Sequence, residues 1–131
     1  MSNGFRDLLV WQKSMQLAVE VYKLTKSFPR EEVYGLTSQI RRSAISIPSN
    51  IAEGHGRLNV GEFRQFLGIA RGSTYELQTQ LELAQSLEFT SADQAELSSR
   101  LSQEIGRMIF ALLGSMQPAS SINGRELKTE N

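Results

Sequence analysis

Residues 59–87 read NVGEFRQFLGIARGSTYELQTQLELAQSL, and this stretch decides the fold class. Asn59 is a favoured N-cap residue, and Glu62 follows it at the spacing of a capping box. Apolar residues then recur at steps of three and four, which is the periodicity of one helix face. The stretch therefore predicts a helix from Asn59 to about Leu87. Its predicted core stripe consists of Phe63, Phe66, Leu67, Ala70, Leu77 and Leu81.

Three further helices are predicted on either side of this stretch. Apolar residues recur at helical spacing over about 7–26, 31–54 and 91–116, and in the last range Ser91 and Gln94 repeat the capping pattern. The connections between these ranges are short, and short connections between long helices favour antiparallel neighbours. The sequence thus predicts an all-α fold, an antiparallel up-down four-helix bundle.

The second predicted helix contains Pro48, which has no backbone N–H and clashes with the preceding turn of a helix. We expect a kink near Pro48. The alternative is a break, in which the helix ends near Ser46 and a short new turn starts with Pro48 as its first residue.

Length and composition indicate a single cytoplasmic domain. The 131 residues suffice for one core, and we assign 7–116 to the bundle, 1–6 to an N-terminal tail and the polar residues 117–131 to a flexible C-terminal tail. Cysteine is absent and no segment is apolar enough to span a membrane, so we expect neither disulfides nor membrane contact. Because 14 basic residues balance 14 acidic ones, any attraction to nucleic acid must come from a local patch.

The first predicted helix carries two apolar stripes, whereas a helix of a monomeric bundle buries one. The stripe predicted to face the core consists of Leu8, Trp11, Met15, Ala18 and Tyr22. The second stripe, which lies roughly 120° away at about 100° per residue, consists of Val10, Ser14, Leu17, Val21 and Leu24. A surplus apolar stripe suggests a partner, so we expect copies of the chain to associate along it.

The second and third predicted helices also carry surplus surface. Ile45 points away from the core stripe of its helix, and Gly61, Gly68 and Gly72 share the face opposite the core. Close approach of another backbone would explain these helix glycines, each of which costs about 1 kcal/mol relative to alanine. The alternative is a thick core with tolerated glycines. The predicted oligomer interface consists of Val10, Leu17, Val21, Leu24, Ile45, Gly68 and Gly72.

Catalytic chemistry finds little support in the sequence. His55 is the only histidine, and it lies between two glycines at the expected corner between the second and third helices. Ser46, Ser49 and Glu53 are near it along the chain, but their spacing does not indicate a catalytic triad. With one histidine and no cysteine, we expect no catalytic residue, no metal site and no cofactor.

Arginines form the most suggestive polar pattern. Arg57, Arg64 and Arg71 are spaced by seven and drift by about 20° per step on a helix, with Tyr75 on the same line. Such a row is suited to follow a phosphate backbone. The alternative is a solvated flank, or salt bridges across an interface to carboxylates such as Glu53 and Glu76. The candidate nucleic-acid-binding residues are Arg41, Arg42, Arg57, Arg64, Arg71 and Tyr75, with Arg100 and Arg107 as additions if they face the same way.

Five segments carry a family resemblance: FRDLLVWQK (5–13), FPREEVYGL (28–36), QIRRSA (39–44), SIPSNIAEG (46–54) and ARGSTYEL (70–77). They resemble the bacterial four-helix-bundle family first noticed in proteins encoded by intervening sequences of 23S ribosomal RNA. The similarity covers about residues 5–116. It implies a left-handed bundle that assembles into a ring, a homopentamer, and it brings no catalytic residue with it.

The resemblance also suggests roles for its own motif residues and for partners. Asn50 and Glu53 are expected to bond across the kink at Pro48, and Gly72 and Ser73 to admit a neighbouring helix. The family is distantly similar to the accessory protein of diversity-generating retroelements, which binds a reverse transcriptase and nucleic acid. That relative is strongly basic, whereas this chain has no net charge.

The function expected from the sequence is that of a non-enzymatic oligomeric adaptor. It would bind RNA, a ribonucleoprotein or another nucleic-acid-processing protein through the arginine row. Two alternatives stay open. One is a purely structural protein-protein interaction module in which the arginines form salt bridges, and the other is an enzyme with an inter-subunit site near His55.

Overall fold

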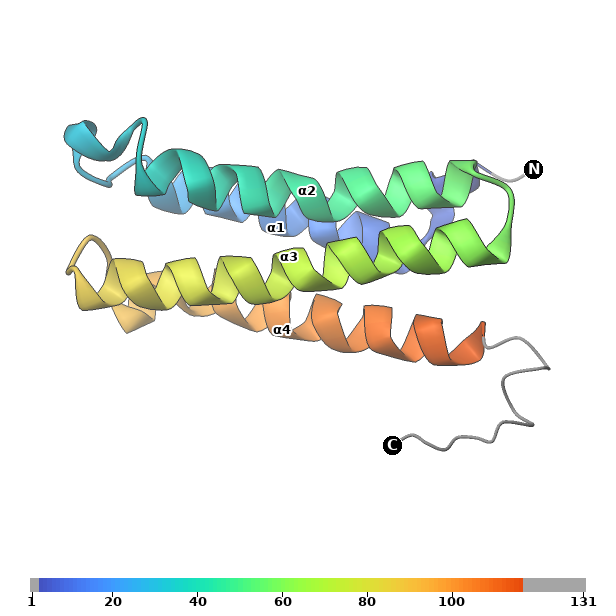
Figure 1. The fold of residues 1–131 in the computed structure, drawn as a ribbon. Coiled ribbons are helices and arrows are strands. Elements are labelled where there is room, and N and C mark those ends of the chain that lie inside the picture. The colour runs from blue at the N-terminus through green and yellow to red at the C-terminus, as the bar shows by residue number, and fades with distance from the viewer. Residues whose placement is uncertain (1–2, 117–131) are drawn as a thin grey trace, which may run out of the picture.

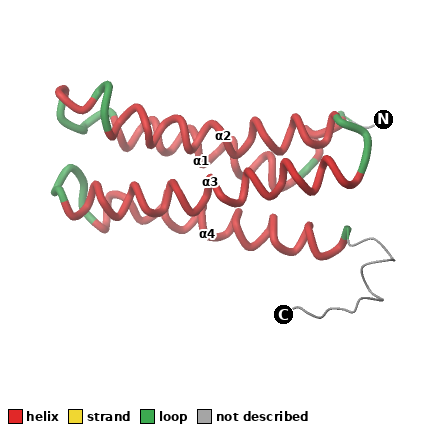
Figure 2. The backbone as a smooth tube through the Cα atoms, in the orientation of Figure 1, coloured by secondary structure: helices red, strands yellow, loops and turns green. Residues whose placement is uncertain are grey.

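The computed structural model describes residues 3–116, and over that range the chain forms an all-α four-helix bundle (Figure 1). Its elements are the 3₁₀ helix η1 (Gly4–Asp7), α1 (Leu9–Thr25), the 3₁₀ helix η2 (Arg30–Glu32), α2 (Leu36–Gly56), α3 (Val60–Ser86) and α4 (Ala92–Ser115). Short loops join the helices at alternate ends of the bundle (Figure 2). The predicted up-down bundle is confirmed, and its left-handedness stays a prediction. The predicted C-terminal tail, 117–131, lies outside the described residues.

The starts of α3 and α4 follow from their capping residues. The Asn59 side chain accepts a hydrogen bond from the Glu62 N–H at 2.8 Å. Ser91 accepts from the Gln94 N–H while the Gln94 side chain accepts from the Ser91 N–H, so the reciprocal capping box is complete. Both predicted caps are confirmed.

The start of α2 lies later than the sequence predicts. Glu31 belongs to the short helix η2, which follows Pro29, and α2 begins only at Leu36. Gly35 separates the two elements with backbone angles of φ −110° and ψ −117°, which are not helical. A short helix placed just before a long one therefore hides the break between them.

Pro48 lies inside α2, and the helix continues past it, so the alternative of a break at Ser46 is wrong. The Asn50 amide nitrogen reaches back across the proline and donates to the Ser46 carbonyl at 2.8 Å and to the Ser46 hydroxyl at 2.9 Å. The expected bond across Pro48 from Asn50 is confirmed. Glu53 instead pairs with Arg57, one turn farther on. The kink itself stays a prediction.

Each helix packs against its neighbours in sequence, and contacts between α1 and α4 close the bundle. α1 and α3 are therefore diagonal partners, as are α2 and α4. As a result, the outer groove between α1 and α2, called the α1/α2 edge below, lies on the opposite side of the bundle from the α3/α4 edge. Figure 1 shows the α1 and α2 pair lying over the α3 and α4 pair.

The core contains the stripe of α1 that was expected to face a partner. Val10, Leu17 and Val21 are buried by the other helices of the same chain, and Leu24 is half-buried against the core. The prediction that Val10, Leu17 and Val21 form an intermolecular interface is therefore wrong, and that for Leu24 stays a prediction. Both stripes of α1 are apolar, so hydrophobicity alone does not decide which of them faces the core; the packing of the helices does. Ser14 fits the centre because its hydroxyl donates to the Trp11 carbonyl within the helix.

The stripe expected in the core lies instead at the border of the bundle. Met15 and Tyr22 are exposed, while Trp11, Ala18 and Leu8 are half-buried against the core. Trp11 is covered from outside by Phe5 of η1, with ring centroids 5.2 Å apart. Aromatic residues with polar tips suit such a border, where the ring is covered and the tip reaches water.

Candidate nucleic-acid interface

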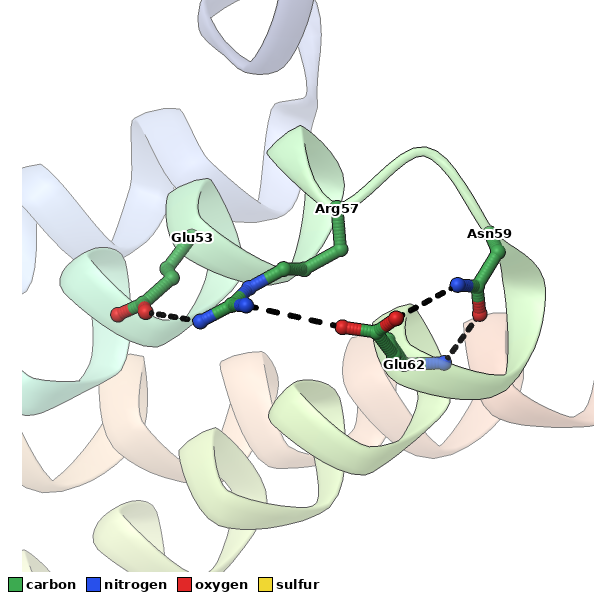
Figure 3. A network of polar contacts seen from close by, with 4 residues as sticks. All are labelled: Glu53, Arg57, Asn59 and Glu62. Carbon is green, nitrogen blue, oxygen red and sulfur yellow. Dashed lines mark hydrogen bonds and ion pairs between the residues drawn. The ribbon is translucent and has the colours of Figure 1, made fainter.

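Arg57, the first of the predicted row, is engaged by two carboxylates. It lies just after α2, where its guanidinium is 2.8 Å from Glu53 and 3.7 Å from Glu62, and Figure 3 shows it between them. Glu62 also accepts from the Asn59 amide at 2.7 Å, and the Arg57 guanidinium lies over the Phe66 ring at 5.0 Å. Arg57 therefore holds the corner between α2 and α3. Its pair with Glu53 is a local contact between residues four apart, so the alternative of salt bridges across an interface stays a prediction.

Arg64, the second of the row, binds the end of α4. It is half-buried, and its terminal nitrogen donates to the Leu113 carbonyl in the last turn of α4. The last carbonyls of a helix have no donor within the helix, and a positive charge there is favoured by the helix dipole. Arg64 thus links α3 to α4, and its guanidinium is engaged within the bundle.

Arg71, the third of the row, lies on the α3/α4 edge between two aromatic rings. Its guanidinium carbon is 5.2 Å from the ring centre of Tyr75 and 5.1 Å from that of Phe110, and a terminal nitrogen donates to the Tyr75 hydroxyl at 2.9 Å. Its Nε is buried and has no hydrogen-bond partner among the described residues. Tyr75, which the sequence places on the same line as Arg71, is thus also in contact with it.

A groove of about 450 Å³ opens beside Arg71 on the α3/α4 edge. The residues that line this α3/α4 groove are Arg71, Tyr75, Gln78, Gln103, Gly106, Arg107 and Phe110. Two arginines and two amide side chains line it, and none of the lining residues is a carboxylate. Arg107 is exposed and forms no ion pair or hydrogen bond within residues 3–116. The groove can therefore accept an anion next to an aromatic surface.

Phe110 is the residue of this groove that sequence reasoning missed. Its side chain is 63% exposed, although the helical periodicity of α4 gives no reason to exclude a phenylalanine from the core. The available signal was its position three residues after Arg107, which places both on one side of α4. Gly106 lines the same groove, and a Cβ there would lie 3.3 Å from the Thr74 hydroxyl oxygen.

The structure does not bring Arg41 and Arg42 to this groove. They lie on α2 and line a pocket on the α1/α2 edge, on the other side of the bundle. The Arg41 Nε donates to the Thr25 hydroxyl at 2.8 Å, and its guanidinium lies 4.5 Å from the Tyr22 ring centre. The six predicted nucleic-acid-binding residues therefore do not form one surface, and only Arg71 and Tyr75 share the α3/α4 groove.

His55 has an aromatic environment near the end of α2. It is half-buried, and its ring lies 5.6 Å from the Phe63 ring in an edge-to-face contact. Asn59 lines the same surface pocket, but its amide is already bonded to Glu62. Within residues 3–116 no three histidine, cysteine or acidic side chains come together as metal ligands. No helix in the same range has the length and apolar character needed to cross a membrane.

A sequence model of the family described as 23S rRNA-intervening sequence protein matches residues 6–111. The chain belongs to this family. The match covers all four helices up to Ala111, so the bundle and the family segment coincide. No curated protein matches this member of the 23S rRNA-intervening sequence protein family.

A solved structure supports the same assignment. This 23S rRNA-intervening sequence protein family member is similar to a Bacteroides thetaiotaomicron protein of unknown function from the S23 ribosomal protein family. The two are 28% identical, the match covers 80% of this chain and 98% of the other, and the TM-score is 0.72. Family and structural relative agree on the fold and assign no activity.

The remaining predicted interface residues of this 23S rRNA-intervening sequence protein family member are open to solvent. Ile45 is 44% exposed on α2 and faces away from the core, as expected. Gly68 and Gly72 are exposed on α3, and a Cβ added at either would meet no atom within 4 Å. Within the described chain, no backbone approaches these two glycines. Their role in self-association stays a prediction.

Proposed function

We propose that this family member is a non-enzymatic, cytoplasmic, oligomeric adaptor that binds single-stranded RNA, free or within a ribonucleoprotein, in the α3/α4 groove. The observation that carries this proposal is the joint placement of Arg71 and Arg107 with the rings of Tyr75 and Phe110. Grooves that bind single strands combine positive charge for the phosphates with aromatic rings on which bases stack.

Local charge supports this reading in a chain without net charge. Arg57 is neutralised by Glu53 and Glu62, so the positive potential of the row is concentrated farther along α3. Arg107 has no carboxylate partner among the described residues, and its guanidinium is free to meet a phosphate. The exposed ring of Phe110 lies beside it in the same groove. A base on Phe110 and a phosphate on Arg107 would belong to neighbouring nucleotides.

Self-association would place several copies of this groove, one from each chain, in a single assembly. We propose a ring, a homopentamer, whose copies meet over exposed surface that includes Ile45, Gly68 and Gly72. Linked grooves raise the effective affinity for one long strand without any new contact. Light scattering tests the assembly directly: the ring predicts a mass about five times that of the 14.7 kDa chain. A mass of one chain at micromolar concentration contradicts it.

RNA binding is tested by fluorescence anisotropy with a labelled single-stranded oligoribonucleotide at several salt concentrations. We expect Arg107→Ala to weaken binding and to reduce the slope of log affinity against log salt by about 0.7, the value for one phosphate contact on a single strand. Phe110→Ala should weaken binding by about 1–3 kcal/mol for each base that it stacks, with the salt slope unchanged. The two variants therefore separate charge from stacking.

The matched control is Arg100→Ala, which removes the same charge from α4 but outside the groove. Arg100 is paired with Glu96 at 3.4 Å, and it does not line the groove. We expect its RNA affinity to equal that of the unmodified chain. Absence of binding at low salt, or an equal loss in Arg100→Ala and Arg107→Ala, contradicts the proposal. Retained assembly without RNA binding would favour a structural protein-protein interaction module instead, in line with the ion pairs of Arg57.

A further inference from the structure

A second polar pocket lies on the α1/α2 edge, on the side of the bundle opposite the α3/α4 groove. It has a volume of about 340 Å³ and opens at the start of α2. Thr37, Ser38, Arg41 and Arg42 supply its polar lining, and Tyr22 contributes an aromatic wall. None of the lining residues is a carboxylate, so the pocket presents positive charge and hydroxyl groups, and no negative charge, to a ligand.

Thr37 and Ser38 belong to the first turn of α2, a helix of 21 residues. The Leu36 N–H donates to the Glu32 carboxylate at 3.1 Å, and the Gln39 N–H donates to the Gly35 carbonyl at 3.1 Å. The N–H groups of Thr37 and Ser38 lie between them, in the turn where a helix provides no carbonyl acceptor of its own. The positive end of the helix dipole therefore points toward the pocket region.

The Thr37 hydroxyl gives an independent indication of a ligand. Thr37 is only 5% exposed, and its Oγ1 is buried without a hydrogen-bond partner among the described residues. Threonine side chains in helices commonly bond a carbonyl of the preceding turn, so an unpaired one at this position is unusual. Thr37 lines the pocket, so a ligand oxygen that draws its hydroxyl into the pocket would satisfy a buried group that the chain leaves unpaired.

The two arginines differ in how firmly they are held. The Arg41 Nε donates to the Thr25 hydroxyl, and the guanidinium lies over the Tyr22 ring, so its orientation is set by both contacts. Its two terminal nitrogens take no part in the bond to Thr25. Arg42 is exposed and forms no ion pair or hydrogen bond within residues 3–116. A fixed guanidinium beside a free one is a suitable arrangement for an anion with several acceptor oxygens.

We propose that this pocket binds the phosphoryl group of a small phosphorylated ligand. The phosphoryl oxygens accept from the Thr37 hydroxyl, from the first-turn groups of Ser38 and from the guanidiniums of Arg41 and Arg42. The Tyr22 ring contacts the organic part of the ligand. The site lies on the opposite side of the bundle from the RNA groove and does not depend on it.

Equilibrium dialysis of the full chain against radiolabelled inorganic phosphate, at constant ionic strength set with chloride, tests the site. We expect saturable binding in the millimolar range or tighter, and a loss of about tenfold in Arg42→Ala. Arg100→Ala, which removes the same charge from α4 on the opposite side, should bind phosphate as the unmodified chain does. Non-saturable retention, or an equal loss in both variants, overturns the proposal.

Thr37→Val provides a second, sharper test because valine keeps the shape and removes only the hydroxyl. Without phosphate, this variant should unfold at a higher temperature than the unmodified chain, since a buried unpaired group is gone. With phosphate, it should gain less stability than the unmodified chain. A lower unfolding temperature without phosphate, or undiminished stabilisation by phosphate, overturns the assignment of Thr37. Arg107→Ala tests the RNA groove, so either site can fail while the other stands.

Discussion

The side of α3 that faces α2 is closed by tight packing and hydrogen bonds, whereas its solvent-facing side carries bare glycines and, at the border with α4, a groove. On the closed side, a Cβ added at Gly54 of α2 would lie 2.5 Å from the Phe66 Cβ. On the open side, a Cβ at Gly68 or Gly72 would meet nothing within 4 Å. The same residue type thus serves close packing on one side and leaves free surface on the other.

Hydrogen bonds reinforce the difference between these two sides. Ser43 of α2 donates to the Gln80 side chain at 2.9 Å, and the hydroxyls of Ser46 and Ser73 are also 2.9 Å apart. Buried polar pairs of this kind accept only one axial register between two helices, because a shift leaves both partners unpaired. The open side instead presents Arg71 and its rings to solvent. The closed side is therefore suited to stability, and the open side is available for binding.

The largest expected effect on stability is that of Gly54→Ala. The new methyl group would overlap the Phe66 Cβ, which cannot move without its helix, so we expect a loss of about 2 kcal/mol or more in the free energy of unfolding. Urea denaturation measures this loss. The matched control is Gly56→Ala in the same turn, where a Cβ meets nothing within 4 Å. Equal stability of the two variants contradicts the close packing of α2 and α3.

Breaking the Ser43 and Gln80 pair should have an intermediate effect. Ser43→Ala leaves the buried Gln80 oxygen without its donor, and we expect a loss of about 1–3 kcal/mol in the free energy of unfolding. The double variant Ser43→Ala with Gln80→Leu should recover part of this loss, because both polar partners are removed together. A double-mutant cycle measures the coupling. Strict additivity would show that the pair does not contribute to the closed side.

Gly72→Ala should have the smallest effect and the opposite sign. Alanine favours the helix by about 1 kcal/mol, and the open side has room for the methyl group, so the dilute chain should become slightly more stable. If copies associate over Gly72, the same methyl group should weaken assembly in light scattering at higher concentration. A less stable chain under dilute conditions would contradict the open side of α3.

Local chemistry made much of the fold predictable from the sequence. The caps at Asn59 and Ser91 depend on side chains that bond residues three positions away, so a short window contains all the required information. The start of α2 was misplaced because the short helix η2 lies just before it, and the interruption between them depends on the non-helical backbone of Gly35. Boundaries that depend on one backbone conformation are thus harder to predict than capped ones.

The candidate site was predictable only in part. Arg71 and Tyr75 share a helix, so their contact follows from spacing. The seven-residue row also predicted one continuous charged surface, but Arg57 is engaged by Glu53 of α2 and Glu62 of α3, and Arg64 by a carbonyl of α4. Phe110 joins the groove because α4 lies beside α3. Contacts between helices depend on partners that are distant in sequence, which spacing within one helix does not contain.

By itself, the sequence determined that there are helices, where two of them are capped and which residues share a face, because these properties depend on neighbours within one or two turns. Only the tertiary structure decided which of the two apolar stripes of α1 enters the core and which arginines are left free. Both outcomes depend on the rotation of each helix about its own axis. That rotation is set by the packing of all the helices together, so the sequence of one helix alone does not determine it.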